Sequence, residues 1–265
     1  MRTAILGAGL MGSWLARELS QDHYIAVYDV DKAKARAACK GVKVFSEPEG
    51  IALFNPEMLI NAVSLQHTLS AFEMVAPLIS RTCIIADIAS IKSEITDYYG
   101  RSPFRFVSVH PMFGPTFADM GALKEESAII IKGSDVEGVK FFRDFFTRLK
   151  VRIFEYSFDE HDRMMAYSLS IPFISSMAFA ACVDGAAVPG TTFARHMKIA
   201  RGLLSEDDHL LAEILFNRYS LAELDRITGK LEHLKHIIRG KDHEEIRIFL
   251  HRLRENVTPG DMAYE

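Results

Sequence analysis

Thr3-Ala-Ile-Leu-Gly-Ala-Gly-Leu-Met-Gly12 is the stretch of this sequence that decides the fold. Its first four residues form a largely apolar run typical of a buried strand, and three glycines follow it with GxGxxG spacing. From Met11 to Leu19 apolar residues recur at intervals of three and four, which predicts a helix directly after the glycines. The stretch therefore predicts the strand, glycine turn and helix that open a dinucleotide-binding βαβ unit.

The glycines have different expected tasks in such a turn. Gly7 permits the tight turn, Gly9 lets the backbone approach a pyrophosphate, and Gly12 lets the helix pack closely on the strand. Leu10 and Met11 begin the helix, where free N–H groups carry a partial positive charge. We assign all five residues to the cofactor site. The alternative is that the glycines serve only a tight strand-to-helix turn.

Asp29 follows the next expected strand, about twenty residues after the glycine turn, as the fingerprint requires. Its carboxylate is expected to accept hydrogen bonds from ribose hydroxyls and to repel a 2′-phosphate, which favours NAD over NADP. Lys32 and Lys34 follow closely and would soften this preference if they faced the ligand. Ala62 and Val63, after a later strand, complete the cofactor residues that we expect.

The first part of the chain alternates short apolar runs with helical patterns, which is typical of a doubly wound parallel sheet. From Asp159 onward only helical patterns remain. We therefore predict an α/β fold with an N-terminal Rossmann-type NAD-binding domain over residues 1–156 and an all-α substrate-binding and dimerisation domain over 157–265. The expected strands are Thr3–Leu6, Ile25–Tyr28, Met58–Asn61, Cys83–Asp87, Phe106–Val109, Ala128–Ile131 and Val151–Phe154; the expected later helices are Asp159–Val183, Ser205–Asn217, Leu221–Arg239 and Asp242–Asn256.

The helix expected over Asp159–Val183 is apolar on more than one side. A solvent-facing helix does not need this, so we expect part of it to pack against a second subunit of a homodimer. The alternative is the central helix of a monomeric bundle. Its apolar part, Ile171–Val183, is interpreted as a buried helix because it is too short to cross a bilayer, and we expect no membrane span.

Composition limits the classes of function. The 265 residues carry a net charge of −4 and 49% hydrophobic residues, with no long run of like charges, so we expect small-molecule partners and no nucleic acid. Cys39, Cys83 and Cys182 are scattered and lack metal-like spacing, which favours reduced thiols, no metal site and a cytoplasmic protein.

Two segments at expected strand ends contain polar residues that packing does not require. They are Asp87-Ile-Ala-Ser-Ile-Lys92 and Val107-Ser-Val-His-Pro-Met-Phe-Gly-Pro115. Together with the glycine turn and the later Glu160-His-Asp-Arg163, they resemble the prephenate dehydrogenase family of tyrosine biosynthesis. The His-Pro-Met-Phe-Gly-Pro segment is the specific part, because the glycine turn alone fits many dehydrogenases.

The resemblance implies oxidative decarboxylation of prephenate to 4-hydroxyphenylpyruvate with NAD. His110 matches the family's catalytic histidine and is suited, when neutral, to accept the proton of the ring C4 hydroxyl. Ser90 matches a serine near the same hydroxyl, although a serine after a strand also commonly caps a helix. His161 and Asp162 match a landmark that helix capping or inter-domain hydrogen bonding explains equally well, so we leave them outside the catalytic set.

Prephenate carries two carboxylates, which predicts cations in the substrate site. The segment from Gly190 to Arg201 offers Arg195, His196 and Arg201, and we name these three as candidate substrate ligands. The resemblance brings the family's arginine to Arg201 or its neighbour Gly202, so that assignment stays ambiguous. Many relatives have a histidine where this chain has Phe173, and His196 is a candidate replacement.

Three other functions stay open. Arogenate differs from prephenate in an amine for a ketone, and the sequence does not separate the two substrates. Helical-tailed dehydrogenases of β-hydroxy acids or imines rely on a lysine in the helical domain, for which Lys198 is the only tempting residue. A dinucleotide-binding regulatory protein without turnover would lack an organised polar second site, whereas Ser90 and His110 are both expected near the nicotinamide.

Overall fold

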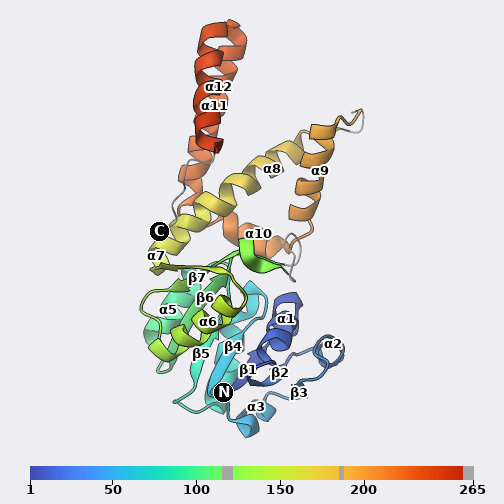
Figure 1. Ribbon diagram of the computed structural model, residues 1–265, viewed down its shortest axis with the longest axis vertical. Helices are drawn as coiled ribbons and strands as arrows, with labels where there is room; N and C mark the ends of the chain where they lie inside the picture. The colour runs from blue at the N-terminus through green and yellow to red at the C-terminus, as the bar shows by residue number, and fades with distance from the viewer. Residues whose placement is uncertain (115–121, 185–187, 259–265) are drawn as a thin grey trace.

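The chain folds into a sheet domain followed by helices (Figure 1). The computed structural model describes residues 1–114, 122–184 and 188–258. An eight-stranded sheet has the order β3-β2-β1-β4-β5-β6-β7-β8, and its strands run parallel except between β6 and β7. The strands are β1 (Arg2–Leu6), β2 (Tyr24–Tyr28), β3 (Lys43–Phe45), β4 (Met58–Asn61), β5 (Ile84–Asp87), β6 (Arg105–Pro111), β7 (Ser127–Ile131) and β8 (Arg152–Tyr156).

Helices cover both faces of the sheet, as in doubly wound folds. On one face α1, α2 and α6 pack in a core with Trp14 and Phe142, and on the other α3, α4 and α5 pack in a core with Phe72. The first six helices are α1 (Leu10–Leu19), α2 (Lys32–Ala38), α3 (Glu49–Phe54), α4 (Thr68–Val75), α5 (Ser93–Arg101) and α6 (Val136–Arg148), with short 3-10 turns at Leu65–His67, Ala76–Leu78 and Leu123–Glu125. The expected Rossmann-type fold is confirmed.

The seven expected strands are all present, with ends shifted by up to two residues. The prediction missed β3, which is only three residues long and leaves little periodicity to detect. It also ended β6 too early. Ser108 pairs with Asp87 of β5, whereas Val109, His110 and Pro111 pair with antiparallel β7. The pairing with β7 thus continues β6 beyond the residue at which its pairing with β5 ends. His110 therefore lies inside a strand.

The glycine turn lies where the strand order reverses. β1 has β2 on one side and β4 on the other. The chain connections on the two sides of β1 run over opposite faces of the sheet, so the turn after β1 lies at the crevice between them. Such switch points are where open α/β sheets bind ligands.

The helical part begins immediately after β8 and extends away from the sheet (Figure 1). The expected boundary at residues 156 and 157 falls between β8 and α7, and we propose it as the domain boundary. The helices are α7 (Phe158–Met165), α8 (Ile171–Ala181), α9 (Thr191–Leu203), α10 (Asp208–Leu215), α11 (Ser220–Gly240) and α12 (His243–Val257).

The long helix expected over Asp159–Val183 is interrupted by a π-helical segment, Ala166–Ser170, between α7 and α8. Pro172 has no backbone N–H and cannot donate to the carbonyl four residues earlier, which explains the irregular turn directly before it. The buried Ser170 side chain, inside this segment, lies 2.7 Å from the Ser220 hydroxyl at the start of α11. The irregular turn therefore also anchors the C-terminal helices.

The expectation of a buried helix over Ile171–Val183 is wrong for a single chain, since no residue of α8 is buried. Its apolar side chains are spread around the helix, which packs against α11 and against α9, where the ring centroids of Phe179 and Phe193 lie 5.3 Å apart. The helix Phe158–Ala181 has 24 residues and a mean hydropathy of 1.4, and only 17% of its most apolar window is buried. By length and composition it is long enough to cross a membrane, contrary to our expectation, although one such helix is weak support for a span.

The last two helices lie side by side as a projecting arm (Figure 1). The ring of His233 in α11 lies 5.3 Å from that of Phe249 in α12. The arm leaves large apolar side chains exposed, among them Leu231, Ile238 and Val257. These side chains are thus without a cover in the described chain.

Candidate active site

The glycine turn passes directly beneath the end of β4. Gly7 has φ +93°, a backbone conformation that favours glycine, and its N–H donates to the carbonyl of Tyr28 at 2.8 Å. A Cβ on Gly7 would lie 2.8 Å from the carbonyl oxygen of Ala62. Glycine is therefore required here both by conformation and by space.

The other two glycines differ in what surrounds them. A Cβ on Gly12 would lie 2.0 Å from the carbonyl oxygen of Gly7, so α1 packs onto the turn itself. A Cβ on Gly9 would meet nothing within 4 Å. Gly12 thus serves the packing of the protein, whereas the space above Gly9 is available to a ligand.

The start of α1 has the properties of an anion site. Gly9 is its N-cap residue and provides no side-chain cap, and the first turn contains no acidic residue. The N–H groups of the first turn of a helix have no intrahelical partner and carry a partial positive charge. With the space above Gly9, these groups suit a phosphate.

Asp29 closes the turn from the side of β2. One carboxylate oxygen accepts the N–H of Ala8 at 2.6 Å, and the other accepts the N–H of Asp31 at 2.8 Å. Each oxygen of a carboxylate can accept a second hydrogen bond. Asp29 thus both supports the glycine turn and retains the capacity to bind hydroxyl groups.

A cavity of about 520 Å³ lies between the turn and the ends of β2 and β4. Five of the expected cofactor residues line it: Gly7, Gly9, Asp29, Ala62 and Val63. Lys34 also lines it, whereas Lys32 pairs with Glu47. Lys34 is therefore the lysine of the two that shares a cavity with Asp29.

A second cavity of about 440 Å³ lies between the sheet and the helical domain. Ser90 and His110 line it together with Leu10 and Met11 from the start of α1. The structure thus brings both expected catalytic residues to one cavity that shares the α1 terminus with the first cavity. The other lining residues are Ile88, Pro111, Met112, Phe113, Gly114, Leu169, Phe173, Leu203, Glu206, Leu210 and Ile214.

His110 belongs to a chain of three hydrogen-bonded side chains. Its Nδ1 lies 3.0 Å from Nε2 of His161, and Nδ1 of His161 lies 3.1 Å from Oδ1 of Asp162. An ionised carboxylate only accepts, so Asp162 selects the His161 tautomer with hydrogen on Nδ1. His161 Nε2 then accepts from His110 Nδ1, which leaves His110 Nε2 as the unprotonated nitrogen.

Burial keeps this histidine pair uncharged. Desolvation lowers the pKa of His110 well below its ordinary value, and electrostatic interactions with His161 and Lys92 lower it further. Desolvation also lowers the pKa of His161, while the hydrogen bond to Asp162 acts in the opposite direction. A neutral imidazole is the form that accepts a proton.

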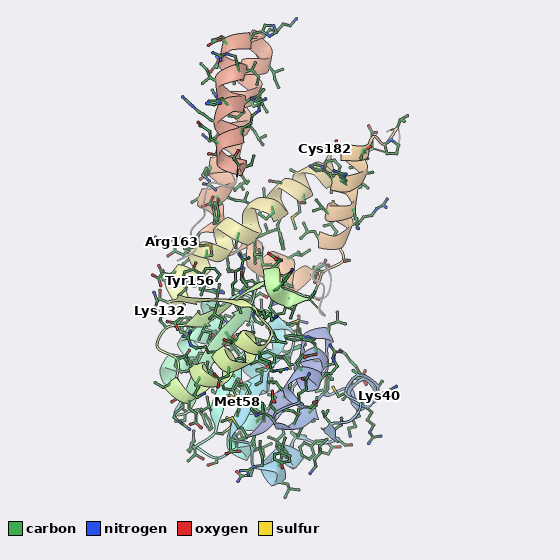
Figure 2. The ribbon with its side chains drawn as sticks, viewed as in Figure 1. Lys40, Met58, Lys132, Tyr156, Arg163 and Cys182 are labelled. Carbon is green, nitrogen blue, oxygen red and sulfur yellow. The ribbon has the colours of Figure 1, made fainter. Side chains whose placement is uncertain are left out.

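Local sequence at the start of α7 positions His161. Ser157 caps the helix by accepting the N–H of Glu160, and the Glu160 carboxylate accepts the N–H of Ser157 in return. Lys132 at the end of β7 donates to the same carboxylate at 2.9 Å. Figure 2 shows Lys132 and Tyr156 close to this junction between sheet and helices. His161, the next residue, is thereby directed towards β6.

Comparison with known proteins agrees with this geometry. Residues 15–155, more than half of the chain, match the prephenate dehydrogenase nucleotide-binding domain. This chain belongs to the prephenate dehydrogenase family. The expected family resemblance is therefore confirmed, and the sheet domain is a nucleotide-binding domain of that family.

Two curated relatives match most of the chain. One is arogenate dehydrogenase 1, chloroplastic, of Arabidopsis thaliana, with 22% identity over 98% of this chain and 42% of that protein. The other is a probable arogenate/prephenate dehydrogenase of Methanocaldococcus jannaschii, with 20% identity over 90% of this chain and 56% of that protein. The chain thus spans about half the length of these relatives.

Solved structures of prephenate dehydrogenase family members share the fold. The Aquifex aeolicus prephenate dehydrogenase in complex with hydroxyphenyl propionate and NAD+ has a TM-score of 0.81 and 17% identity, over 97% of this chain and 96% of that chain. Synechocystis arogenate dehydrogenase has a TM-score of 0.75 and 18% identity, over 97% and 98%. These values show the common fold.

The expected cationic ligands of this family member do not line the second cavity. Arg195, His196 and Arg201 are exposed on α9, and His196 Nδ1 lies 3.0 Å from the carbonyl of Thr192. Among the lining residues that the structure describes, none is a lysine or an arginine. The substrate roles of these three residues stay predictions. Pro115, which ends the histidine segment, lies outside the described residues.

Sequence reasoning left His161 and Asp162 outside the catalytic set and did not consider Glu206. The adjacent histidine and aspartate after a capping box were the available signal for the first two. Their contact with His110 spans 51 residues of sequence, so no local pattern could establish it. Glu206, between α9 and α10, gave no signal because single exposed-looking glutamates are common.

Proposed function

We propose that this chain catalyses the NAD+-dependent oxidative decarboxylation of prephenate to 4-hydroxyphenylpyruvate, a reaction of tyrosine biosynthesis. The observation that carries the proposal is the position of His110, buried in a cavity beside the start of α1 and hydrogen-bonded to His161. A regulatory protein without turnover would not need this arrangement. The family membership supports an oxidoreductase.

The residues present fit NAD+. The open space above Gly9 and the uncapped start of α1 suit the pyrophosphate, and Asp29 in the first cavity suits the adenosine ribose. Leu10 and Met11 line the cavity of His110. A dinucleotide bound at the start of α1 would therefore extend its nicotinamide half towards that cavity. When bound, NAD+ would accept the hydride from ring C4. The Aquifex aeolicus relative was solved with NAD+.

His110 supplies the base in this proposal. Its Nε2 accepts the proton of the C4 hydroxyl as that carbon is oxidised, and the ring then loses its C1 carboxylate as carbon dioxide. The proton on His110 returns to the oxygen of the new phenol, so the reaction needs no further acid. His161 holds the base in the required tautomer by accepting its Nδ1 hydrogen. Ser90 lines the same cavity and would orient the hydroxyl.

A direct assay tests the function. Formation of NADH should be measured with prephenate and with arogenate, each with NAD+ and with NADP+. We expect turnover with NAD+ and at least one of the two substrates. Tight NAD+ binding without turnover on either substrate would instead favour the regulatory alternative.

Arogenate is the second candidate substrate, and one observation favours it. Glu206 is the only acidic residue among the described residues that line the cavity of His110, and no arginine or lysine is among them. A carboxylate attracts the ammonium group of arogenate, whereas the neutral keto group at the same position of prephenate offers it no positive charge.

Glu206→Gln therefore separates the two substrates. If Glu206 contacts the ammonium group, the variant should raise KM for arogenate by about tenfold, the value of one charge-assisted hydrogen bond, and leave KM for prephenate unchanged or lower. Glu213→Gln on α10, outside this cavity, is the matched control and should change neither value. Equal changes for both substrates would exclude this role of Glu206.

Asp29→Asn should relax the preference for NAD+. The amide oxygen can still accept the N–H of Ala8 and so keep the contact to the glycine turn, while the contact to the N–H of Asp31 and the negative charge that repels a 2′-phosphate are lost. We expect the ratio of kcat/KM for NAD+ over NADP+ to fall by about tenfold or more, as one lost charge-assisted contact predicts. Asp31→Asn, which retains the cap of α2, is the control. An unchanged ratio would contradict the ribose role of Asp29.

We also propose that the chain functions as a homodimer through its helical domain. Support comes from α8, which has no buried residue, and from the exposed apolar side chains of the projecting arm. Apolar surface of this extent on a helical domain is typical of an interface between subunits. A partner subunit would also explain how cations such as Arg195 or Arg201 reach a substrate.

A further inference from the structure

Lys92 is completely buried beneath the candidate active site. Its side chain and that of Asp87 both have 0% exposure, and the two form an ion pair. Lys92 Nζ also donates to the carbonyl oxygen of Val109 at 2.8 Å. Lysine is almost never buried in this way without a specific partner, and the fold alone does not require a charge at this position.

Asp87 opposes the effect of burial on Lys92: desolvation lowers the pKa of Lys92, whereas the charge and the hydrogen bond of Asp87 raise it. Its carboxylate accepts three hydrogen bonds: from Lys92, from the Tyr99 hydroxyl at 2.8 Å and from the N–H of Ala89 at 3.0 Å. Several donors to a buried carboxylate favour its ionised form. A buried carboxylate needs a counter-charge, and Lys92 is the cation in direct contact with it.

The same contacts join the two segments that carry the expected catalytic residues. Ala89 immediately precedes Ser90, and Val109 immediately precedes His110. Asp87 holds the first segment and Lys92 holds the second. The ion pair therefore sets the position of Ser90 relative to His110.

The charge of Lys92 also acts on the histidine pair. Around His110 the titratable groups are Lys92, Asp87 on β5, Tyr99 on α5, and His161 and Asp162 on α7, with Glu206 lining the same cavity. Lys92 lowers the pKa of both histidines, whereas Asp87 and Asp162 raise that of His161. For His110 the positive charge adds to desolvation in the same direction.

We infer that Lys92 is a positioning residue for His110: its buried ammonium group ties together the segments of Ser90 and His110 and brings its positive charge close to the imidazole. The inference rests on the proposed function, in which His110 is the base. It assigns to the Asp-Ile-Ala-Ser-Ile-Lys segment a second task besides carrying Ser90.

Nuclear magnetic resonance titration of His110 tests the inference without any turnover. The variants are Lys92→Met and the double variant Asp87→Asn with Lys92→Met, which removes both charges so that no unpaired charge stays buried. In Lys92→Met we expect the His110 midpoint to rise by about one pH unit, because a neighbouring positive charge is removed. In the double variant we expect a smaller rise, because the negative charge of Asp87 is removed as well. The acid limb of kcat/KM should move upward with it.

Two further readouts separate positioning from simple stability. At alkaline pH, where His110 is neutral in every variant, kcat should still fall by about tenfold because Ser90 and His110 lose their relative position. NAD+ affinity should stay within about twofold, since the glycine turn is untouched. Lys140→Met on α6, which removes an exposed lysine paired with the exposed Asp144, is the matched control and should move neither midpoint nor kcat.

Unchanged His110 midpoints in both variants would overturn the inference, whatever happens to the rate. Failure of the double variant to fold, judged by circular dichroism, would assign the pair to stability alone and would overturn it as well. If the wild-type protein oxidises neither substrate, the proposed function fails, but the titration still measures the action of Lys92 on His110.

Discussion

His110→Asn is expected to lower kcat/KM by about 10²–10⁴-fold, the contribution of a general base, while NAD+ affinity stays within about twofold. Asparagine retains a hydrogen-bonding side chain but cannot accept the proton. In the wild type the neutral imidazole is the active form, and burial lowers its pKa. Activity should therefore be flat above that lowered value and decline as the pH falls through it. The pH profile of kcat/KM checks this sign.

The control for this variant is His243→Asn, at the start of α12 and far in sequence from the cavity, which should retain wild-type rates. The wild-type acid limb should lie below the ordinary histidine value of about 6.5. A variant at position 110 that keeps most of its rate, or an acid limb well above that value, would remove His110 from the role of base.

Gly12→Ala is expected to have the largest effect on the nucleotide-binding domain. The added Cβ would lie 2.0 Å from the carbonyl oxygen of Gly7, and neither backbone can yield without shifting α1. We expect a loss of about 3 kcal/mol of stability, a decrease in Tm of roughly 10 °C and NAD+ affinity at least about a hundredfold weaker. Thermal unfolding and NAD+ titration measure these effects.

Gly9→Ala and Gly100→Ala separate the causes. A Cβ on Gly9 meets no protein atom within 4 Å, so this variant should keep its Tm but lose NAD+ affinity, because the methyl group occupies the space of the pyrophosphate. Gly100, in α5, is equally open and lines neither cavity, so its replacement should lower neither the Tm nor the NAD+ affinity. A Gly9→Ala variant with normal NAD+ affinity would contradict the assigned position of the pyrophosphate.

Much of the cofactor site could be predicted from the sequence because its determinants are local. Gly7, Gly9 and Gly12 lie within one turn, and Asp29 follows the adjacent strand at a spacing that one βαβ unit imposes. The residue pattern of a strand is also local, so the longer strands were predicted. β3 was missed because three residues are too few to show such a pattern. Parallel strand ends meet at one edge, so the shared cavity of Ser90 and His110 also followed from the strand assignments.

The helical domain shows where local patterns were insufficient. Apolar residues in Ile171–Val183 predicted a helix correctly, but the burial of a helix depends on which layers cover it, and a single chain leaves α8 without a buried residue. Arg195 and Arg201 have a helical spacing that suited a substrate site, yet α9 leaves both exposed. Whether a segment forms a helix depends on residues within a few turns, whereas the orientation of that helix depends on its packing against other elements.

The sequence by itself determined the βαβ order, the glycine turn with Asp29 and the presence of a histidine at the edge of the sheet, because each follows from contacts between neighbours along the chain. Only the tertiary structure decided that His161 supports His110, across 51 residues, and that Lys92 joins β5 to β6. Both depend on how α7 and the 88–92 segment pack against β6, and hydrogen-bond geometry at about 3 Å is set by packing rather than by spacing.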